Sequence, residues 1–116
     1  MTKRVLVVDD HALFREGIVS LLTVAGYNVV AEVGDGEVAV QEVVRLKPDL
    51  VLLDINLPGM DGLETLQKIR EVYEEAQVIM LTASENNAHL VTAVRYGARG
   101  YLLKTLDSKG FIASIQ

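Results

Sequence analysis

Short apolar runs alternate with longer amphipathic stretches along the whole chain, and this alternation restricts the fold more than any other feature. Three of the runs are almost uninterrupted Val, Leu and Ile, which is typical of strands buried on both faces of a parallel sheet. Repeated strand–helix units of this kind predict an open, mostly parallel sheet with helices on both faces. We expect an α/β fold of the flavodoxin-like type, a (βα)5 three-layer sandwich with strand order 2-1-3-4-5. The predicted strands are residues 4–8, 29–33, 50–53, 78–81 and 100–103.

The amphipathic stretches predict helices between these strands. In the first, the apolar side chains share one face, Arg15 lies off that face, and Gly26 ends the helix. The third begins with a predicted capping box formed by Asp61 and Glu64. Further helices are predicted for residues 84–96 and from about residue 107 onward.

Size and charge exclude several classes of protein. We expect residues 1–116 to form a single domain, because a chain of 116 residues has no room for a second one. The net charge is −5 and no basic run is present, so direct binding to a nucleic-acid backbone is not expected. The absence of cysteine excludes disulfides, thiolate catalysis and Cys-based zinc sites. No apolar stretch suits a signal peptide or a membrane span, so we expect a cytoplasmic protein with no membrane contact.

Polar side chains follow four of the five predicted strands. They are Asp9 and Asp10 after the first strand, Asp54 after the third, Thr82 after the fourth and Lys104 after the fifth. The carboxyl ends of the strands form the ligand-binding edge in sheets of this type. Two carboxylates about 4 Å apart repel by roughly 4 kcal/mol at an effective dielectric constant of 20, so such a cluster needs a cation or a proton.

Each of these residues also has a purely structural interpretation. Asp10 could cap a helix, Asp54 could begin a turn, Thr82 could end a strand, and Lys104 could be a solvated surface residue. The set as a whole is better explained as a site, because oxygen ligands favour a hard cation such as Mg²⁺. Carboxylates that hold Mg²⁺ beside a lysine and a hydroxyl indicate phosphoryl transfer, with Asp54 as the candidate nucleophile.

Four sequence blocks resemble the receiver domains of bacterial two-component response regulators. The resemblance covers essentially the whole chain, in order and at the expected spacing. It implies the flavodoxin-like fold predicted above, and it implies a phosphorylation-dependent switch whose only catalysis is its own phosphorylation and dephosphorylation. The blocks are VVDDH (residues 7–11), DLVLLDINLPGMDG (49–62), LTA (81–83) and GARGYLLK (97–104).

The resemblance also implies a role for individual residues. Asp54 would accept a phosphoryl group from a phosphohistidine on a sensor histidine kinase. Asp10, Asp54 and the backbone carbonyl of Asn56 would bind Mg²⁺ directly, and Asp9 would contribute mainly through water.

Three more residues would respond to the phosphoryl group. Lys104 would pair with its oxygens, and Thr82 would donate a hydrogen bond to them. Tyr101 would turn inward when Thr82 moves. The face formed by the fourth helix, the fifth strand and the fifth helix would then change, and it is a candidate surface for a phosphorylation-dependent homodimer.

The details resemble the NarL/FixJ group of response regulators. Thr105 follows Lys104 where many receiver domains have proline. Members of this group usually carry a helix-turn-helix DNA-binding domain after the receiver, so transcription is the expected output and DNA contact would come only from that domain. The last predicted helix reaches Gln116 after barely two turns and is interpreted as cut within the helix.

Three other interpretations compete with this one. A phosphatase of the haloacid-dehalogenase kind needs a second acid two residues after the nucleophile, and Asn56 stands there. A nucleotide- or flavin-binding module would rest on Gly34 and Gly36 alone, without the third glycine and the lysine of a phosphate loop. A degenerate receiver would lack one of the key groups, and all are present. His11 is expected to flank the metal site at the start of a helix and His89 to be a polar helix position, and neither receives a predicted function.

Overall fold

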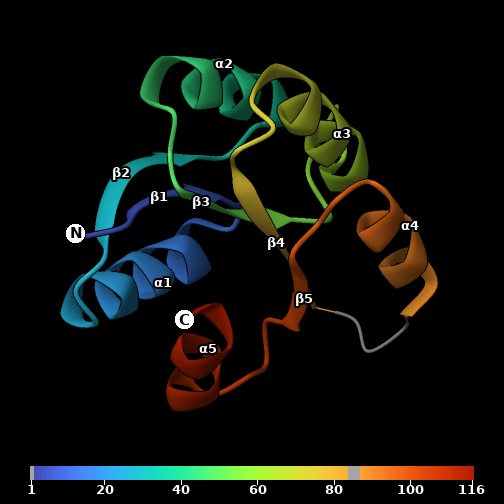
Figure 1. The fold of residues 1–116 in the computed structure, drawn as a ribbon. Helices are drawn as coiled ribbons and strands as arrows, with labels where there is room; N and C mark the ends of the chain where they lie inside the picture. Colours follow the sequence, from blue (N-terminus) through green and yellow to red (C-terminus); the bar gives the residue numbers. More distant parts are fainter. Residues whose placement is uncertain (1, 84–86) are drawn as a thin grey trace.

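The computed structural model describes residues 2–83 and 87–116, which form one five-stranded parallel sheet with helices on both faces (Figure 1). The strand order is β2-β1-β3-β4-β5, as predicted. No helix in these two described ranges has the length and apolar character needed to span a bilayer. The elements are β1 (Arg4–Val8), α1 (Ala12–Val24), β2 (Asn28–Val33), α2 (Gly36–Leu46), β3 (Leu50–Asp54), α3 (Gly62–Val72), β4 (Gln77–Thr82), the 3-10 helix η1 (Asn87–His89), α4 (Leu90–Arg95), β5 (Gly100–Leu103) and α5 (Ser108–Ile115).

The sheet divides the hydrophobic core into two layers, because successive strand residues point to opposite faces. On one face, Leu6, Leu53 and Met80 belong to a cluster with buried residues of α2, α3 and α4. On the other face, Val7 and Leu52 belong to a cluster with buried residues of α1 and α5. Figure 1 shows the same division, with α1 and α5 on one side of the sheet and α2, α3 and α4 on the other. Burial on both faces explains why the central strands are continuous apolar runs.

Local signals account for most helix boundaries. The side chains of Asp35, Asp61 and Asp107 each accept a hydrogen bond from a backbone N–H in the first turn of α2, α3 and α5, respectively. Asp61 accepts from the Glu64 N–H at 2.9 Å, which is one half of the predicted capping box. After α1 the chain turns through Gly26, whose φ is +96°. This conformation favours glycine and explains the end of the helix.

The structure corrects some of the predicted boundaries. Asp54 and Thr82 are the last residues of β3 and β4, so they end their strands and do not follow them. Strand β2 begins one residue earlier than predicted, at Asn28. The predicted start of the fourth helix lies outside the described residues, and its described α-helical part is Leu90–Arg95. The described residues contain no cis peptide bond, so the Lys104–Thr105 peptide is trans.

Candidate functional site

The polar residues predicted from the strand ends meet at the carboxyl edge of the sheet. Backbone hydrogen bonds hold the strand ends in register: the Ile55 N–H donates to the Leu81 carbonyl at 2.9 Å, and the Lys104 N–H donates to the Thr82 carbonyl at 2.7 Å. Strand pairing therefore brings the carboxyl ends of β3, β4 and β5 to one line, with Asp9 at the end of β1 next to them.

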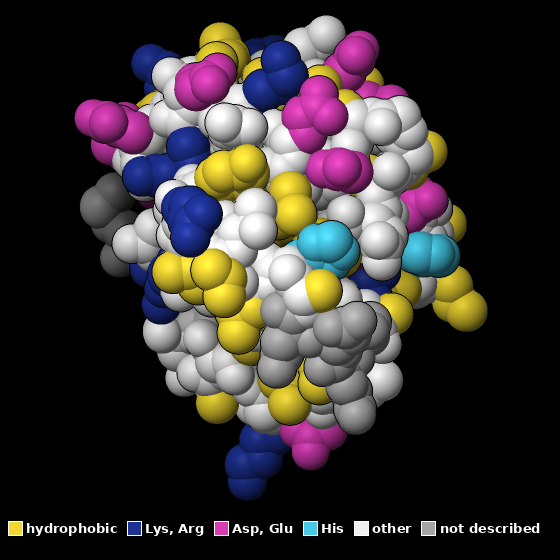
Figure 2. All heavy atoms as spheres, turned by 90° about the vertical axis from the view of Figure 1, so that its right-hand side faces the viewer, with side chains coloured by type: hydrophobic (Ala, Val, Ile, Leu, Met, Phe, Trp, Pro, Cys, Tyr) yellow, Lys and Arg dark blue, Asp and Glu magenta, His cyan; other side chains and the backbone are white. Residues whose placement is uncertain are grey.

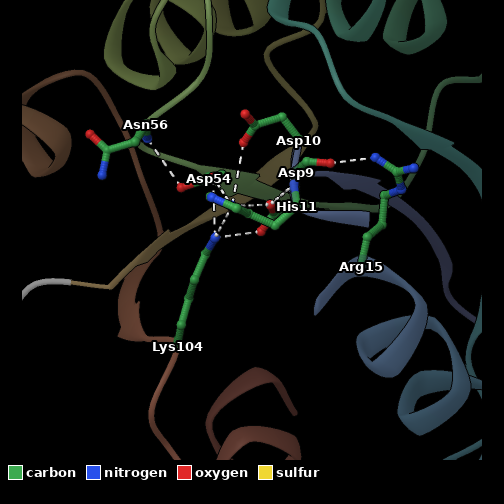
Figure 3. A network of polar contacts seen from close by, with 7 residues as sticks. All are labelled: Asp9, Asp10, His11, Arg15, Asp54, Asn56 and Lys104. Carbon is green, nitrogen blue, oxygen red and sulfur yellow. Dashed lines mark hydrogen bonds and ion pairs between the residues drawn. The ribbon is translucent and has the colours of Figure 1, made fainter. Parts of the chain in front are cut away.

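A buried lysine–carboxylate network forms the centre of this site (Figure 3). The Lys104 ammonium lies 2.7 Å from Asp9 Oδ2 and 3.2 Å from Asp54 Oδ2. The side chains of Asp9 and Asp54 are 0% and 1% exposed, whereas that of Asp10 is 35% exposed. The lysine also lies over the ring of Phe14, with its Nζ 4.7 Å from the ring centroid. One ammonium thus contacts two buried carboxylates and offsets only part of their charge, and a third carboxylate stays accessible from solvent.

His11 was given no role by the sequence, yet its ring lies within this network. Its Nδ1 is 3.1 Å from Asp9 Oδ1, 3.4 Å from Asp10 Oδ1 and 3.7 Å from Asp54 Oδ2. Its backbone N–H also donates to Asp9 Oδ1 at 2.8 Å, which fixes the start of α1 to the acid pair. The imidazole is 63% exposed, so it lies between the carboxylates and solvent.

Burial raises the pKa of the Asp54 carboxyl, and the negative charge of Asp9 adds to this effect. Two groups oppose it and lower the pKa: the Asn56 N–H, which donates to Asp54 Oδ1 at 3.1 Å, and the Lys104 ammonium. Figure 3 shows that the Asn56 side chain points away from the carboxylates, so this residue meets Asp54 through its backbone. Asp54 therefore has one oxygen bound to the backbone and one oxygen directed at Lys104.

Arg15 is a second residue that the sequence did not assign to the site. Helical spacing predicts it on the solvent side of α1, but its side chain is only 23% exposed and reaches back to the end of β1. One guanidinium nitrogen donates to the Asp9 carbonyl at 2.5 Å, and Nε lies 3.5 Å from Glu32 Oε1. A Cβ on Gly34 would lie 3.2 Å from the same guanidinium, so this glycine leaves room for it. Arg15 thus holds the backbone of the acid pair in place.

Gly62 is required by the close approach of α3 to the loop after β3. A Cβ at this position would lie 2.3 Å from the Asp54 carbonyl oxygen and 2.5 Å from Ile55 Cα. These are backbone atoms and cannot rotate away. The start of α3 is therefore packed directly against the residue that carries the candidate nucleophile.

Thr82 and Tyr101 lie beside the network. The Thr82 side chain is 2% exposed at the end of β4. Tyr101 pairs with Met80 across β4 and β5, and its ring packs against the core cluster that includes Ala93 of α4. Its hydroxyl is buried and has no hydrogen-bond partner in the described part of the chain. The sequence placed Thr82 at this edge, and the resemblance alone singled out Tyr101, whose hydroxyl is buried in the structure.

The donor set fits a small, hard divalent cation. Asp9, Asp10, His11 and Asp54 each offer a ligand atom, and these atoms all lie within 4.8 Å of one another. Three of the four groups are carboxylates, which are the ligands that Mg²⁺ prefers. The network carries more negative charge than Lys104 can offset, so a bound cation would relieve the remaining repulsion.

Comparison with known proteins agrees with this geometry. The chain is 38% identical over 112 residues to the nitrate/nitrite response regulator protein NarL of Escherichia coli (strain K12), covering 96% of this chain and 52% of that protein. It is 36% identical over 115 residues to the chemotaxis protein CheY of Thermotoga maritima, covering 99% and 96%.

Solved structures give the same result. The signal receiver domain of the putative response regulator NarL from Mycobacterium tuberculosis superposes with a TM-score of 0.91 at 37% identity, covering 98% of this chain and 93% of that chain. A two-component response regulator of the LuxR family from Aurantimonas sp. SI85-9A1 gives a TM-score of 0.93 at 34% identity, covering 99% and 83%.

The chain spans about half the length of the E. coli NarL protein that it matches. Its own residues 5–116 match the response regulator receiver domain family. Since this match covers almost the whole chain and includes every strand, the phosphatase and nucleotide-binding alternatives are set aside. The chain therefore belongs to the response regulator receiver domain family of two-component signalling systems.

Proposed function

We propose that Asp54 accepts a phosphoryl group and that Lys104, Thr82 and a bound Mg²⁺ assist the transfer. The observation that carries this proposal is the position of the Asp54 carboxylate. It is buried at the end of a central strand, and Oδ2 lies 3.2 Å from the Lys104 ammonium beside the acid pair. Receiver domains as a family accept phosphoryl groups. Asp9 is equally buried and also contacts Lys104, but it lies beyond the end of β1, whereas Asp54 is the last residue of the central strand β3.

In the transfer, an Asp54 carboxylate oxygen bonds to phosphorus while the bond between phosphorus and the donor nitrogen of a phosphohistidine breaks. The donor imidazole leaves with the electron pair of that bond and takes up a proton. Asp54 must be ionised to attack, and the Lys104 ammonium and the Asn56 N–H both favour the ionised form. The Thr82 hydroxyl would donate a hydrogen bond to one phosphoryl oxygen. The Lys104 ammonium, which now contacts Asp54 Oδ2, would pair with another phosphoryl oxygen.

Mg²⁺, when bound, would neutralise charge on the phosphoryl oxygens. Asp10, Asp54 and the Asn56 backbone carbonyl would hold the ion directly. Asp9 would act mainly through water, because its oxygens already accept from the His11 N–H and pair with Lys104. The accessible Asp10 side chain gives the ion a path from solvent.

Phosphorylation would act on the whole domain through Thr82 and Tyr101. A phosphoryl group brings about −1.5 to −2 charges and three acceptor oxygens to the end of β3. Movement of Thr82 toward it would open space next to Tyr101, whose ring packs toward α4 and whose hydroxyl has no described partner to lose. The face formed by α4, β5 and α5 would change as a result.

We further propose that residues 1–116 are the receiver domain of a longer transcription regulator. Its partners would be a sensor histidine kinase and, through the α4–β5–α5 face, a second copy of the phosphorylated chain. DNA would be bound only by a helix-turn-helix output domain. The proposal rests on the NarL-type relatives, of which this chain matches about half. In this scheme the receiver catalyses only its own phosphorylation and dephosphorylation.

The direct test is chemical phosphorylation with acetyl phosphate and Mg²⁺, followed by intact-protein mass spectrometry. The parent chain is expected to gain one phosphoryl group that is stable in acid and labile in base. Asp54→Asn is expected to gain none. Asp61→Asn is the matched control, because Asp61 caps α3 at the surface and asparagine is an equally good cap. Undiminished labelling of Asp54→Asn would refute the assignment.

A further inference from the structure

The imidazole of His11 adds a nitrogen donor to a site that otherwise offers oxygen. We propose that His11 Nδ1 is a metal ligand and that it gives this site a preference for first-row transition cations, such as Ni²⁺, Cu²⁺ and Zn²⁺, over Mg²⁺. This inference concerns the same metal site and rests on the proposed function for the presence of an ion there. It adds a residue and a class of cation that the receiver family does not imply.

The distances from His11 are those of neighbouring ligands around one ion. Bonds of 2.0–2.2 Å from metal to nitrogen and oxygen place adjacent ligand atoms about 3.0 Å apart at right angles and about 3.4 Å apart at the tetrahedral angle. His11 Nδ1 lies 3.1 Å from Asp9 Oδ1 and 3.4 Å from Asp10 Oδ1. Asp54 Oδ2, at 3.7 Å, needs to move by only a few tenths of an ångström. His11, Asp10 and Asp54 can therefore reach one ion without a change of fold, while Asp9 contributes mainly through water.

The orientation of the ring is fixed by the backbone and leaves the site open. The His11 N–H is bound to Asp9 Oδ1, and His11 is the N-cap residue of α1 with an extended backbone. This geometry directs Nδ1 toward the carboxylates while 63% of the side chain stays exposed. Lys104 pairs with the other oxygen of Asp9, Oδ2, at 2.7 Å, and its Nζ also lies 3.3 Å from His11 Nδ1. An ion bound by the imidazole therefore displaces the ammonium from Nδ1, and it can enter past the exposed ring.

Ligand chemistry sets the expected order of affinities. Mg²⁺ binds oxygen and gains little from imidazole, whereas Ni²⁺, Cu²⁺ and Zn²⁺ bind imidazole strongly. The sequence makes this contribution easy to isolate, since it contains no cysteine and only two histidines. The candidate ligand cluster found among residues 2–83 and 87–116 contains His11 and not His89. His89, which ends η1, is therefore a matched control.

The test is isothermal titration of Ni²⁺ and, separately, Mg²⁺ into the metal-stripped, untagged and unphosphorylated chain. We expect Ni²⁺ to bind at least about tenfold more tightly than Mg²⁺ in the parent. His11→Ala should weaken Ni²⁺ binding by about tenfold or more and change Mg²⁺ binding by less than about threefold. His89→Ala should leave both unchanged. His11→Asn keeps a polar side chain at the start of α1, so it controls for a local disturbance of the helix. It should weaken Ni²⁺ binding as His11→Ala does.

A spectroscopic signature separates direct coordination from an indirect effect. Electron paramagnetic resonance of bound Cu²⁺ should show nitrogen coupling in the parent and in His89→Ala, and this coupling should be lost in both His11 variants. Equal Ni²⁺ affinity in the parent and the His11 variants, or retained nitrogen coupling, would overturn the inference. Labelling of Asp54 by acetyl phosphate is measured in a separate experiment with Mg²⁺. A failure of this labelling would overturn the proposed function, whereas the titrations alone decide whether His11 is a metal ligand.

Discussion

Two buried carboxylates with one lysine between them dominate the energetics of the site at the scale of single residues. Asp9 and Asp54 are withdrawn from solvent almost completely, and Lys104 lies within 3.2 Å of both. Burial of an ionised group costs several kcal/mol unless partners compensate it. The lysine and the Asn56 N–H compensate only part of this cost for Asp54, because its pKa remains raised. The nucleophile is therefore kept at some cost to the stability of the fold.

This cost predicts that Asp54→Asn stabilises the metal-free protein near pH 7. A raised folded-state pKa means that the ionised carboxylate destabilises the fold at every pH above that value. The penalty decreases as the pH falls through the raised pKa and disappears below the ordinary value of 3.8. We expect a Tm several degrees above the parent at pH 7, since about 1 kcal/mol moves Tm by roughly 4–6 °C in a domain of this size.

Thermal melts of both proteins from pH 3 to pH 8, without divalent cations, check this prediction. The gain should shrink toward the acidic end of the range. A variant that is less stable than the parent at pH 7, or a gain that grows as the pH falls, would contradict the argument.

The close approach at Gly62 predicts a large effect from one methyl group. Gly62→Ala places a Cβ 2.3 Å from the Asp54 carbonyl oxygen, so α3 or the loop after β3 must move. We expect a loss of about 1–3 kcal/mol in the free energy of unfolding and slower labelling of Asp54 by acetyl phosphate. Gly17→Ala in α1 is the control, because nothing lies within 4 Å of its added Cβ. It should be neutral or stabilise the helix by up to about 1 kcal/mol in urea unfolding.

At the scale of elements, the parallel register connects the phosphoacceptor to the opposite edge of the sheet. The end of β3 is bonded to β4 at Leu81, and the loop after β5 is bonded to the last residue of β4. In the proposed switch, a displacement at Thr82 would therefore be transmitted to β5 and to the neighbouring α4. This helix is short, and its Val91 and Val94 are 64% and 60% exposed. Figure 2, which views the molecule from the side on which α4 lies in Figure 1, shows hydrophobic side chains on the surface. Exposed apolar side chains of this kind suit a surface that binds a partner.

This connection predicts that Thr82→Ala separates phosphorylation from the change in the α4–β5 face. The variant keeps Asp54 and Lys104, so it should still be labelled by acetyl phosphate. Beryllofluoride, which stands for the phosphoryl group on Asp54, should shift NMR resonances of residues 96–104 in the parent and much less in Thr82→Ala. Thr82→Ser should restore the shift. Thr23→Ala, which removes a hydroxyl bonded to Val19 on α1, is the control. Equal shifts in the parent and Thr82→Ala would show that this hydroxyl is not the coupling group.

At the scale of the whole molecule, three carboxylates of this acidic domain lie together at one edge of the sheet. The net charge of −5 is spread over the chain, but the carboxylates of Asp9, Asp10 and Asp54 lie together and are only partly neutralised by Lys104. A cation that binds there stabilises the folded state, because the unfolded chain does not preserve the cluster. Stability should then depend on the concentration of a divalent cation more than on general ionic strength.

We therefore predict that Mg²⁺ raises the Tm of the parent and has little effect on Asp10→Asn. Binding to the folded state alone contributes about 2.7 kcal/mol at a ligand concentration of 100 times Kd. The measurement is a series of thermal melts in MgCl₂ and in NaCl of equal ionic strength. Asp49→Asn is the control, because Asp49 lies just before β3, where its carboxylate accepts from the Arg4 N–H. Equal stabilisation of the parent and Asp10→Asn by Mg²⁺ would contradict a site at this edge.

Several features of this protein could be predicted from the order of its residues. Continuous apolar runs indicated buried strands, and Asp61 and Asp107 marked helix starts that the structure confirms. Because parallel strands place their carboxyl ends at one edge, Asp9, Asp54 and Lys104 were expected to meet, and they do. Strand ends were less accurate: hydrogen bonds to a neighbouring strand decide where a strand stops, and they extend β3 and β4 by one residue.

The sequence by itself determined the fold class and the family to which the chain belongs, since these depend on periodicity and on motifs that are local in the chain. The strand order followed from the fold that this resemblance implies. Only the tertiary structure decided what His11 and Arg15 contact. His11 immediately precedes α1, and Arg15 lies on the predicted solvent face of that helix, yet His11 contacts the Asp9 carboxylate and Arg15 contacts the Asp9 carbonyl. The same holds for Gly62: only the structure shows that a Cβ at this position would collide with the backbone of Asp54, against which α3 packs. Contacts between elements depend on distances in space, and no local pattern encodes them.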